Sequence, residues 1–266
     1  MNPIGVFDSG VGGLTVLRAL RGAYPLDDFI YLGDTARLPY GTKSAATVTR
    51  YSLQCAELLV RRGIRCLVVA CNTASASALS ALRLAHPSLP VIGVIDPGAE
   101  AAVAASRSQH IAVIATEGTI AGGAYQAAIR RLNGMARVTA GACSLFVAMA
   151  EEGWIEGEIP EAVARRYLAP MFRGTDIPDT LVLGCTHFPV LARAIGAVLP
   201  PGVRVVDSAA TTAAALLRQV APSTAGRGRV AWLATDDSAR FARVGSSFLG
   251  ETLHAADVEI VDLIAA

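Results

Sequence analysis

Short apolar runs alternate with stretches of helical periodicity along almost the whole chain. The runs at 66–70 and 181–183 are apolar at every position, as the buried strands of parallel sheets are. Alternating strands and helices are typical of parallel sheets covered by helices on both faces, so the sequence predicts an α/β protein. The expected strands are 4–7, 29–32, 66–70, 91–94, 111–115, 181–183, 203–206, 230–233 and 258–261, and the clearest expected helices are 14–21, 47–62, 121–132 and 162–172.

The polar residues at the ends of the expected strands repeat in the two halves of the chain. They are Asp8-Ser9, Cys71-Asn72-Thr73 and Asp96 in the first half, and Thr116, Cys185-Thr186-His187 and Asp207 in the second. The repeat predicts two similar lobes, each a mostly parallel sheet flanked by helices, with one cysteine in each. We expect residues 1–96 plus 209–266 in the first lobe and 97–208 in the second, with the active site in the cleft between them.

The composition excludes several classes of protein. Of 266 residues, 53% are hydrophobic and 17% charged, with a net charge of +1, so we expect no nucleic-acid partner. The stretch 66–82 carries no charge, but it is interrupted by polar residues, whereas a spanning helix needs about 20 mostly apolar residues. The N-terminus begins with an expected strand and has no signal-peptide pattern. We therefore expect a cytoplasmic protein without a membrane partner.

The cysteine and lysine content bears on disulfides, metals and cofactors. There are five cysteines, an odd count without an export signal, which argues against a disulfide framework. No two cysteines form a C-x-x-C pair, and His187 is the only histidine within three residues of a cysteine, so we expect no metal. Lys43 is the only lysine, and no pattern around it suggests the Schiff-base lysine of a pyridoxal enzyme. We expect no cofactor.

Two of the cysteines lie where ligands bind in α/β proteins. Cys71 and Cys185 each directly follow a buried strand and precede an expected helix. The free N–H groups of a helix N-terminus would lower the pKa of the thiol and favour the thiolate. Cys55, in an amphipathic helix, and Cys66, inside a strand, fit the usual role of free cysteine as a core residue.

Other polar residues of these strand ends are further candidates. Asp8 and Ser9 begin a glycine-rich loop whose spacing matches neither the dinucleotide-binding nor the P-loop motif. Tyr40 lies on a long loop at the same expected edge, where ligand-binding loops are common. His187 is the only histidine within a motif. Glu151 is a weaker candidate, because its position also fits a solvated helix end.

Two thiols without metal or cofactor suggest a symmetric proton transfer. A single cysteine with a histidine would instead suggest acyl transfer. In racemisation one base removes the α-proton and a conjugate acid returns a proton on the opposite face, and the two groups exchange roles with direction. Hydrogen-bond donors and exclusion of water would have to stabilise the carbanion. The expected donors are hydroxyl and N–H groups of Ser9, Tyr40-Gly41, Thr73 and Thr186.

Four segments of the chain resemble the signatures of glutamate racemases in the aspartate/glutamate racemase family. They are IGVFDSGVGGL at 4–14, YLGDTARLPYG at 31–41, ACNTA at 70–74 and LGCTHFP at 183–189. The resemblance extends over almost the whole chain. Related aspartate racemases usually carry a glutamate after the second Cys-Thr pair, where this chain has His187, and this difference favours glutamate as the substrate.

The resemblance implies roles for these residues. Cys71 would act on D-glutamate with assistance from Asp8, and Cys185 on L-glutamate with assistance from His187, without a cofactor. D-glutamate would supply peptidoglycan synthesis, and hence cell-wall biogenesis and cell shape. The expected substrate-contacting residues are Asp8, Ser9, Tyr40, Gly41, Asn72, Thr73, Thr186 and His187, with Thr116, Thr119 and Glu151 as further candidates.

Alternatives remain open at this point. A racemase of a related acid, of the aspartate or hydantoin type, would carry the same two cysteines. A non-catalytic regulatory protein on the same fold would not need both, and a phosphate- or nucleotide-binding module would need the lysine and glycine spacing that the chain lacks. The sequence is compatible with a homodimer but does not decide the oligomeric state.

Overall fold

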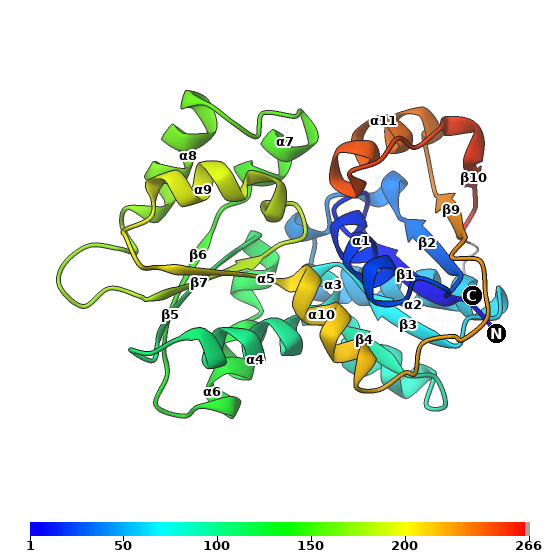
Figure 1. Cartoon of the computed structure of the whole chain (residues 1–266), viewed down its shortest axis with the longest axis horizontal. Coiled ribbons are helices and arrows are strands. Elements are labelled where there is room, and N and C mark those ends of the chain that lie inside the picture. Colours follow the sequence, from blue (N-terminus) through cyan, green and yellow to red (C-terminus); the bar gives the residue numbers. More distant parts are fainter. Residues whose placement is uncertain (264–266) are drawn as a thin grey trace.

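The structure is a computed structural model that describes residues 1–263. Two sheets lie side by side, each with its own helices (Figure 1). The first lobe contains both the blue and cyan N-terminal part and the orange and red C-terminal part of the chain, and the second lobe is the green and yellow middle part. The prediction of an α/β protein with two similar lobes is confirmed.

The first lobe has a six-stranded sheet of order β10-β9-β2-β1-β3-β4, in which all pairings are parallel. Its strands are β1 (Ile4–Asp8), β2 (Phe29–Gly33), β3 (Cys66–Val69), β4 (Val91–Gly93), β9 (Val230–Ala234) and β10 (Val258–Ile260). Its helices are α1 (Leu14–Ala23), α2 (Ala45–Arg61), α3 (Asn72–Ala85), α10 (Ser208–Leu217) and α11 (Ser238–Leu249).

Alternate side chains of the first sheet pack on its two faces, as the pleat of a strand requires. In β1, Ile4 and Val6 belong to the core that α1, α10 and α11 cover, whereas Phe7 belongs to the core under α2 and α3. Every residue of β1, β2 and β3 is buried. This double burial explains why these strands, apart from Asp8 at the end of β1, do not alternate between apolar and charged residues.

The second lobe has a four-stranded parallel sheet of order β6-β5-β7-β8. Its strands are β5 (His110–Ala115), β6 (Arg137–Ala142), β7 (Thr180–Gly184) and β8 (Arg204–Asp207). Its helices are α4 (Ile95–Ala105), α5 (Glu117–Ala121), α6 (Ala124–Leu132), α7 (Leu145–Glu151), α8 (Glu158–Leu168) and α9 (Ala192–Val198). Short 3₁₀ helices complete the structure: η1 (Thr35–Arg37), η2 (Tyr40–Thr42), η3 (Phe188–Leu191) and η4 (Ala255–Asp257).

Some predicted elements differ from the structure. All nine predicted strands are present within one or two residues, but β6 was not predicted. The helix predicted over 121–132 is present as α6 but begins three residues later, because Gly122 and Gly123 separate it from α5 and Gly123 has a φ of 65°. The helix predicted over 162–172 begins and ends four residues earlier. Asp96 lies in the first turn of α4 rather than at a strand end.

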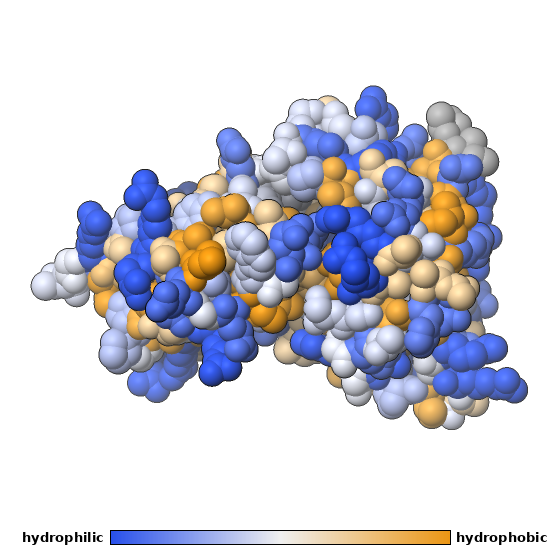
Figure 2. All heavy atoms as spheres, turned by 90° about the horizontal axis from the view of Figure 1, so that it is seen from above, coloured by the Kyte–Doolittle hydropathy of each residue, from blue (hydrophilic) through white to orange (hydrophobic). Residues whose placement is uncertain are grey.

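The chain passes from the first sheet to the second between β4 and α4, and returns after β8 into α10. The division at residues 96 and 209 stays a prediction. Within residues 1–263, every helix is too short or too polar to cross a lipid bilayer. Hydrophilic and apolar residues are interspersed over the face of the molecule that Figure 2 shows.

Candidate active site

Cys71 lies between β3 and α3 and is 5% exposed. It caps α3, since its Sγ accepts a hydrogen bond from the N–H of Ala74 at 3.5 Å, and its thiol faces the Ser9 hydroxyl at 3.6 Å. Burial, reinforced by the negative charge of Asp8, raises the pKa of Cys71 to about 12. The N–H of Ala74 at the helix N-terminus does lower this pKa, but desolvation of the thiolate outweighs it, so the predicted net shift toward the thiolate is wrong.

Asp8 lies at the end of β1, close enough to Cys71 for its charge to affect the thiol, and is fully buried. Its Oδ2 accepts a hydrogen bond from the N–H of Gly10 at 2.9 Å, while its Oδ1 has no partner among the described residues. Burial raises the pKa of this carboxyl group, although the positive charge of His187 and backbone N–H groups oppose the shift. Asp8 is therefore suited to hold a proton close to Cys71.

Cys185 follows β7 and is 6% exposed. The helix after it is the 3₁₀ helix η3 rather than an α-helix, so its surroundings differ from those of Cys71. Its nearest polar partner is His187, whose Nδ1 lies 3.9 Å from Sγ. His187 therefore places an ionisable side chain beside the Cys185 thiol.

His187 is held between Cys185 and Glu151, whose Oε1 lies 3.1 Å from Nε2 of the imidazole. Burial alone would lower the pKa of His187, but the interactions with Cys185, Glu151 and Asp8 raise it to about 10. Burial likewise opposes ionisation of Glu151, yet hydrogen bonds from His187 and Arg240 hold its pKa below the usual range. Glu151 therefore supports the site rather than forming a solvated helix end.

Tyr40 contributes to the wall of the pocket, but its hydroxyl points elsewhere. The hydroxyl donates a hydrogen bond to Oδ2 of Asp34, which is fully buried. Asp34 also accepts from Nε of Arg37, at 2.7 and 3.0 Å, and from the Thr235 hydroxyl at 3.0 Å. This network fixes the loop 34–42, whose Tyr40-Gly41 segment lines the pocket.

Three threonines join the lobes at another side of the site. The hydroxyl of Thr73, on α3, lies 3.0 Å from that of Thr116 and 3.1 Å from that of Thr119. Thr116 and Thr119 are also 3.1 Å apart. Thr73 and Thr116 line the pocket, whereas Thr119 orients the other two hydroxyls from behind.

Two glycines permit close contact between the lobes. A Cβ at Gly12 would overlap Nδ1 of His187 and lie 2.6 Å from the Thr186 hydroxyl. A Cβ at Gly41 would lie 2.6 Å from Cβ of Thr116. Neither site tolerates a side chain unless residues of the opposite lobe move, so these glycines set how closely the two halves approach.

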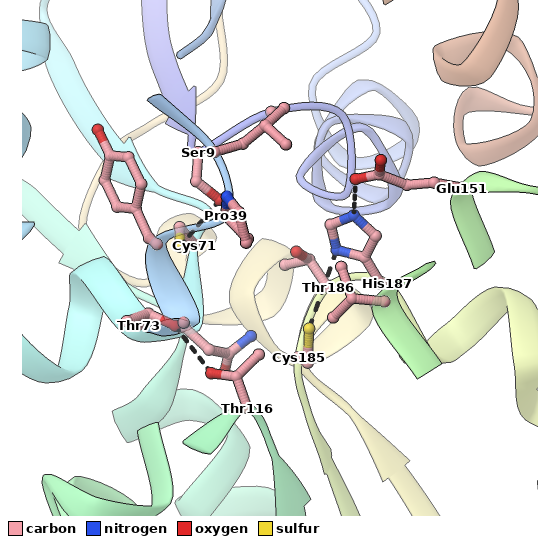
Figure 3. Close-up of a pocket in the computed structure, with 15 residues that line it drawn as sticks. Ser9, Pro39, Cys71, Thr73, Thr116, Glu151, Cys185, Thr186 and His187 are labelled. Carbon is pink, nitrogen blue, oxygen red and sulfur yellow. Dashed lines mark hydrogen bonds and ion pairs between the residues drawn. The ribbon is translucent and has the colours of Figure 1, made fainter. Parts of the chain in front are cut away.

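The structure brings the predicted residues of both lobes together in one pocket (Figure 3). In this view Cys71 and Cys185 reach the pocket from different lobes. The predicted residues that line it are Ser9, Tyr40, Gly41, Cys71, Asn72, Thr73, Thr116, Glu151, Cys185, Thr186 and His187. Asp8 and Thr119 lie behind this layer. Gly10, Leu38, Pro39 and Val147 also line the pocket but were not predicted as site residues.

Comparison with known proteins shows close relatives. A model of the Asp/Glu/Hydantoin racemase family matches residues 15–216. The glutamate racemase of Geobacter metallireducens is 52% identical over 94% of this chain and 93% of its own length. The structure of glutamate racemase from Francisella tularensis in complex with D-glutamate is similar with a TM-score of 0.89 and 37% identity, covering 98% of both chains. That of the Thermus thermophilus enzyme with β-chloro-D-alanine has a TM-score of 0.86 and 44% identity, covering 98% of this chain and 97% of that one.

Proposed function

The chain belongs to the Asp/Glu/Hydantoin racemase family, and we propose that this amino-acid racemase interconverts L- and D-glutamate by moving the α-proton between Cys71 and Cys185. The observation that carries the proposal is that one buried cysteine from each lobe reaches the same pocket. Glutamate is favoured over aspartate or a hydantoin because the similar proteins described above are glutamate racemases. A screen of both enantiomers of these compounds separates the alternatives.

In the direction from L- to D-glutamate, Cys185 acts as the base. The charged imidazolium of His187 stabilises the thiolate of Cys185, which removes the α-proton. Cys71 is protonated at neutral pH because burial holds its pKa at about 12, so its thiol donates a proton to the opposite face of the carbanion. The cycle leaves a thiol at Cys185 and a thiolate at Cys71, and proton exchange with solvent restores the starting state.

In the reverse direction the two groups exchange roles. Cys71 must first lose its proton, and Asp8 assists by accepting it, since burial has raised the pKa of this carboxyl group. The Cys71 thiolate then removes the α-proton of D-glutamate. Cys185 returns a proton on the other face, with His187 stabilising the thiolate that remains.

The pocket supplies hydrogen bonds in place of an electron sink. Ser9, Asn72, Thr73, Thr116 and Thr186 line it with polar side chains, and these residues are the proposed substrate contacts together with Tyr40-Gly41. Thr119 and Glu151 act from behind, by orienting hydroxyls and His187. Enclosure between the lobes strengthens each interaction by excluding water. No step requires a cofactor.

We also propose that the enzyme works in the cytoplasm and that its D-glutamate supplies peptidoglycan synthesis. These proposals rest on the resemblance to glutamate racemases. Loss of the gene in the source bacterium should create a requirement for added D-glutamate, and growth without it would contradict the proposed role.

Isotope exchange tests the two-thiol mechanism. Cofactor-free protein is incubated with L-glutamate in deuterated water. At low conversion the enantiomers are separated, and their deuterium content is measured by mass spectrometry. The D-glutamate formed should carry deuterium at the α-carbon, because Cys71 exchanges with solvent independently of Cys185. The remaining L-glutamate should keep its original proton. Substantial undeuterated D-glutamate would indicate a single base that serves both faces.

A further inference from the structure

The side-chain amide of Asn72 has one end bound by the protein and one end free. Asn72 is the first residue of α3, is 3% exposed and lines the pocket. Its Oδ1 accepts a hydrogen bond from the Tyr125 hydroxyl at 2.8 Å, whereas its buried Nδ2 has no partner among the described residues. A buried donor without a partner is energetically unfavourable, so this free N–H group is expected to bind a ligand.

Tyr125 lies outside the pocket, in the first turn of α6, and is fully buried. Glycines on two neighbouring elements leave room for its ring. A Cβ at Gly184 would lie 2.9 Å from Cε2 of Tyr125, and a Cβ at Gly98 would lie 3.1 Å from its hydroxyl oxygen. The ring therefore has little freedom, and the position of its hydroxyl is defined by packing.

The direction of the hydrogen bond determines which atoms of the amide face the substrate. Burial, with the nearby Cys185 and Asp207, raises the pKa of Tyr125 far above its usual range, so the hydroxyl keeps its proton. It can therefore donate to Oδ1 at any pH at which the protein is folded. With Oδ1 held in this way, both Nδ2 protons are available on the pocket side.

We propose that Tyr125 is a positioning residue for substrate binding: by holding Oδ1 of Asn72, its hydroxyl presents the Asn72 N–H groups to an acceptor atom of the substrate. The inference rests on the proposed function in that the acceptor belongs to glutamate, whose carboxylates only accept hydrogen bonds. Without the hydroxyl, the amide can rotate by half a turn and present its oxygen to a carboxylate instead.

The hydrogen bond also links this orientation to the arrangement of the lobes. Asn72 is on α3 of the first lobe and Tyr125 on α6 of the second. The amide is held only while the two lobes are in contact. Contact of the lobes thus prepares the donor for the substrate, which lowers the entropy cost of binding.

The test compares Tyr125→Phe with Tyr24→Phe. Tyr24 is also fully buried, and its hydroxyl donates to the carbonyl oxygen of Val220 at 2.8 Å, away from the pocket. Both variants lose one buried hydrogen bond, so a similar fall in Tm is expected. Only Tyr125→Phe should raise KM for both enantiomers of glutamate, about tenfold, which is the loss expected for one well-oriented donor, about 1.4 kcal/mol. Its kcat should change less than its KM.

A double-mutant cycle separates positioning from a general structural role. If Tyr125 acts through Asn72, the double variant Asn72→Ala/Tyr125→Phe should have the same KM as Asn72→Ala alone. If the double variant instead showed a rise in KM equal to the product of the two single-variant rises, the inference would be overturned. So would an unchanged KM in the single Tyr125→Phe variant while the wild-type protein racemises glutamate.

A ligand-free measurement keeps the inference testable if glutamate is not the substrate. In ¹⁵N NMR spectra of the free protein, Tyr125→Phe should shift the side-chain NH₂ signals of Asn72 and speed their exchange with solvent, and Tyr24→Phe should not. An unchanged Asn72 signal in Tyr125→Phe would refute the positioning role. Absence of racemisation by the wild-type protein would refute only the proposed function.

Discussion

Nη2 of Arg240 lies 2.9 Å from Oε2 of Glu151, so an ion pair joins α11 of the first lobe to α7 of the second. The other oxygen of Glu151 contacts His187. Glu151 therefore lies between a cation from each lobe. The Arg240 side chain is 44% exposed, and an ion pair of this kind contributes at most about 1 kcal/mol to stability. Its influence on His187 is the more consequential effect.

Replacing Arg240 by Gln should raise the pKa of His187, because Glu151 would then direct its whole negative charge at the imidazolium. The rate of racemisation should fall roughly fivefold, equivalent to about 1 kcal/mol, because the full charge of Glu151 offsets the positive charge that His187 presents to Cys185. An NMR titration of the imidazole and a progress curve measure the two effects. Arg243→Gln is the matched control, since this exposed arginine is on the same helix. Equal effects of both substitutions would show that only net charge matters.

His187 makes stability depend on pH in a defined range. Its pKa is 6.5 as a model value and about 10 in the folded protein, so folding favours the protonated form. The resulting stabilisation is complete below about pH 6.5, declines as the pH rises and is lost above about pH 10. Urea denaturation of the wild-type protein and His187→Asn should show a difference in unfolding free energy that narrows over this range. A difference that widens toward pH 10 would contradict the assignment.

The cysteines should divide into two classes. Cys71→Ala and Cys185→Ala should each reduce the rate of racemisation by several orders of magnitude, because each removes one of the two proposed proton carriers. Cys55→Ala and Cys66→Ala should cost about 1 kcal/mol of stability and keep most activity, since both thiols lie in the core. Enzyme assays and thermal unfolding of the four variants check this. A Cys55→Ala variant as inactive as Cys71→Ala would refute the division.

Gly12→Ala should impair catalysis through His187. The added methyl group would overlap the imidazole and force either His187 or the whole lobe to move. A fall in kcat of at least about tenfold is expected, equivalent to 1.4 kcal/mol. Gly22→Ala, in α1, is the control, because its methyl group would meet no atom within 4 Å. The Gly22→Ala variant should keep full activity and gain up to about 1 kcal/mol in free energy of unfolding. Full activity of Gly12→Ala would show that the contact is unimportant.

Lys43→Ala should leave racemisation intact. The only lysine of the chain does not line the pocket, although it follows Gly41 by two residues. The purified wild-type protein should show no pyridoxal absorbance. Loss of such a band together with activity in Lys43→Ala would establish a cofactor-dependent mechanism instead.

Much of the fold could be predicted because the buried parallel strands are apolar at every position. β6 escaped prediction since it is an edge strand whose residues are partly exposed and whose sequence contains Thr139 and Gly141. The break between α5 and α6 depends on the backbone of Gly123. Ala121 before the two glycines and Ala124 after them let the stretch read as one continuous helix.

The site was predictable where its residues end parallel strands, because such ends meet at one edge of a sheet. Asp8 and Cys71 are of this kind. Arg240 and Tyr125 were not predicted, since each reaches the site only through a contact with a sequence-distant residue, 89 positions away for Arg240 and 53 for Tyr125. The pKa of Cys71 was predicted wrongly because sequence reveals its helix but not the depth of its burial.

The burial of all five free cysteines has a consequence for chemical labelling. With no thiol on the surface, a reagent such as iodoacetamide reaches Cys71 or Cys185 through the pocket that both side chains line. The rate of alkylation in the native protein therefore reports how accessible that pocket is. The extent to which added glutamate slows alkylation would give the fraction of pockets that hold glutamate, without any measurement of turnover.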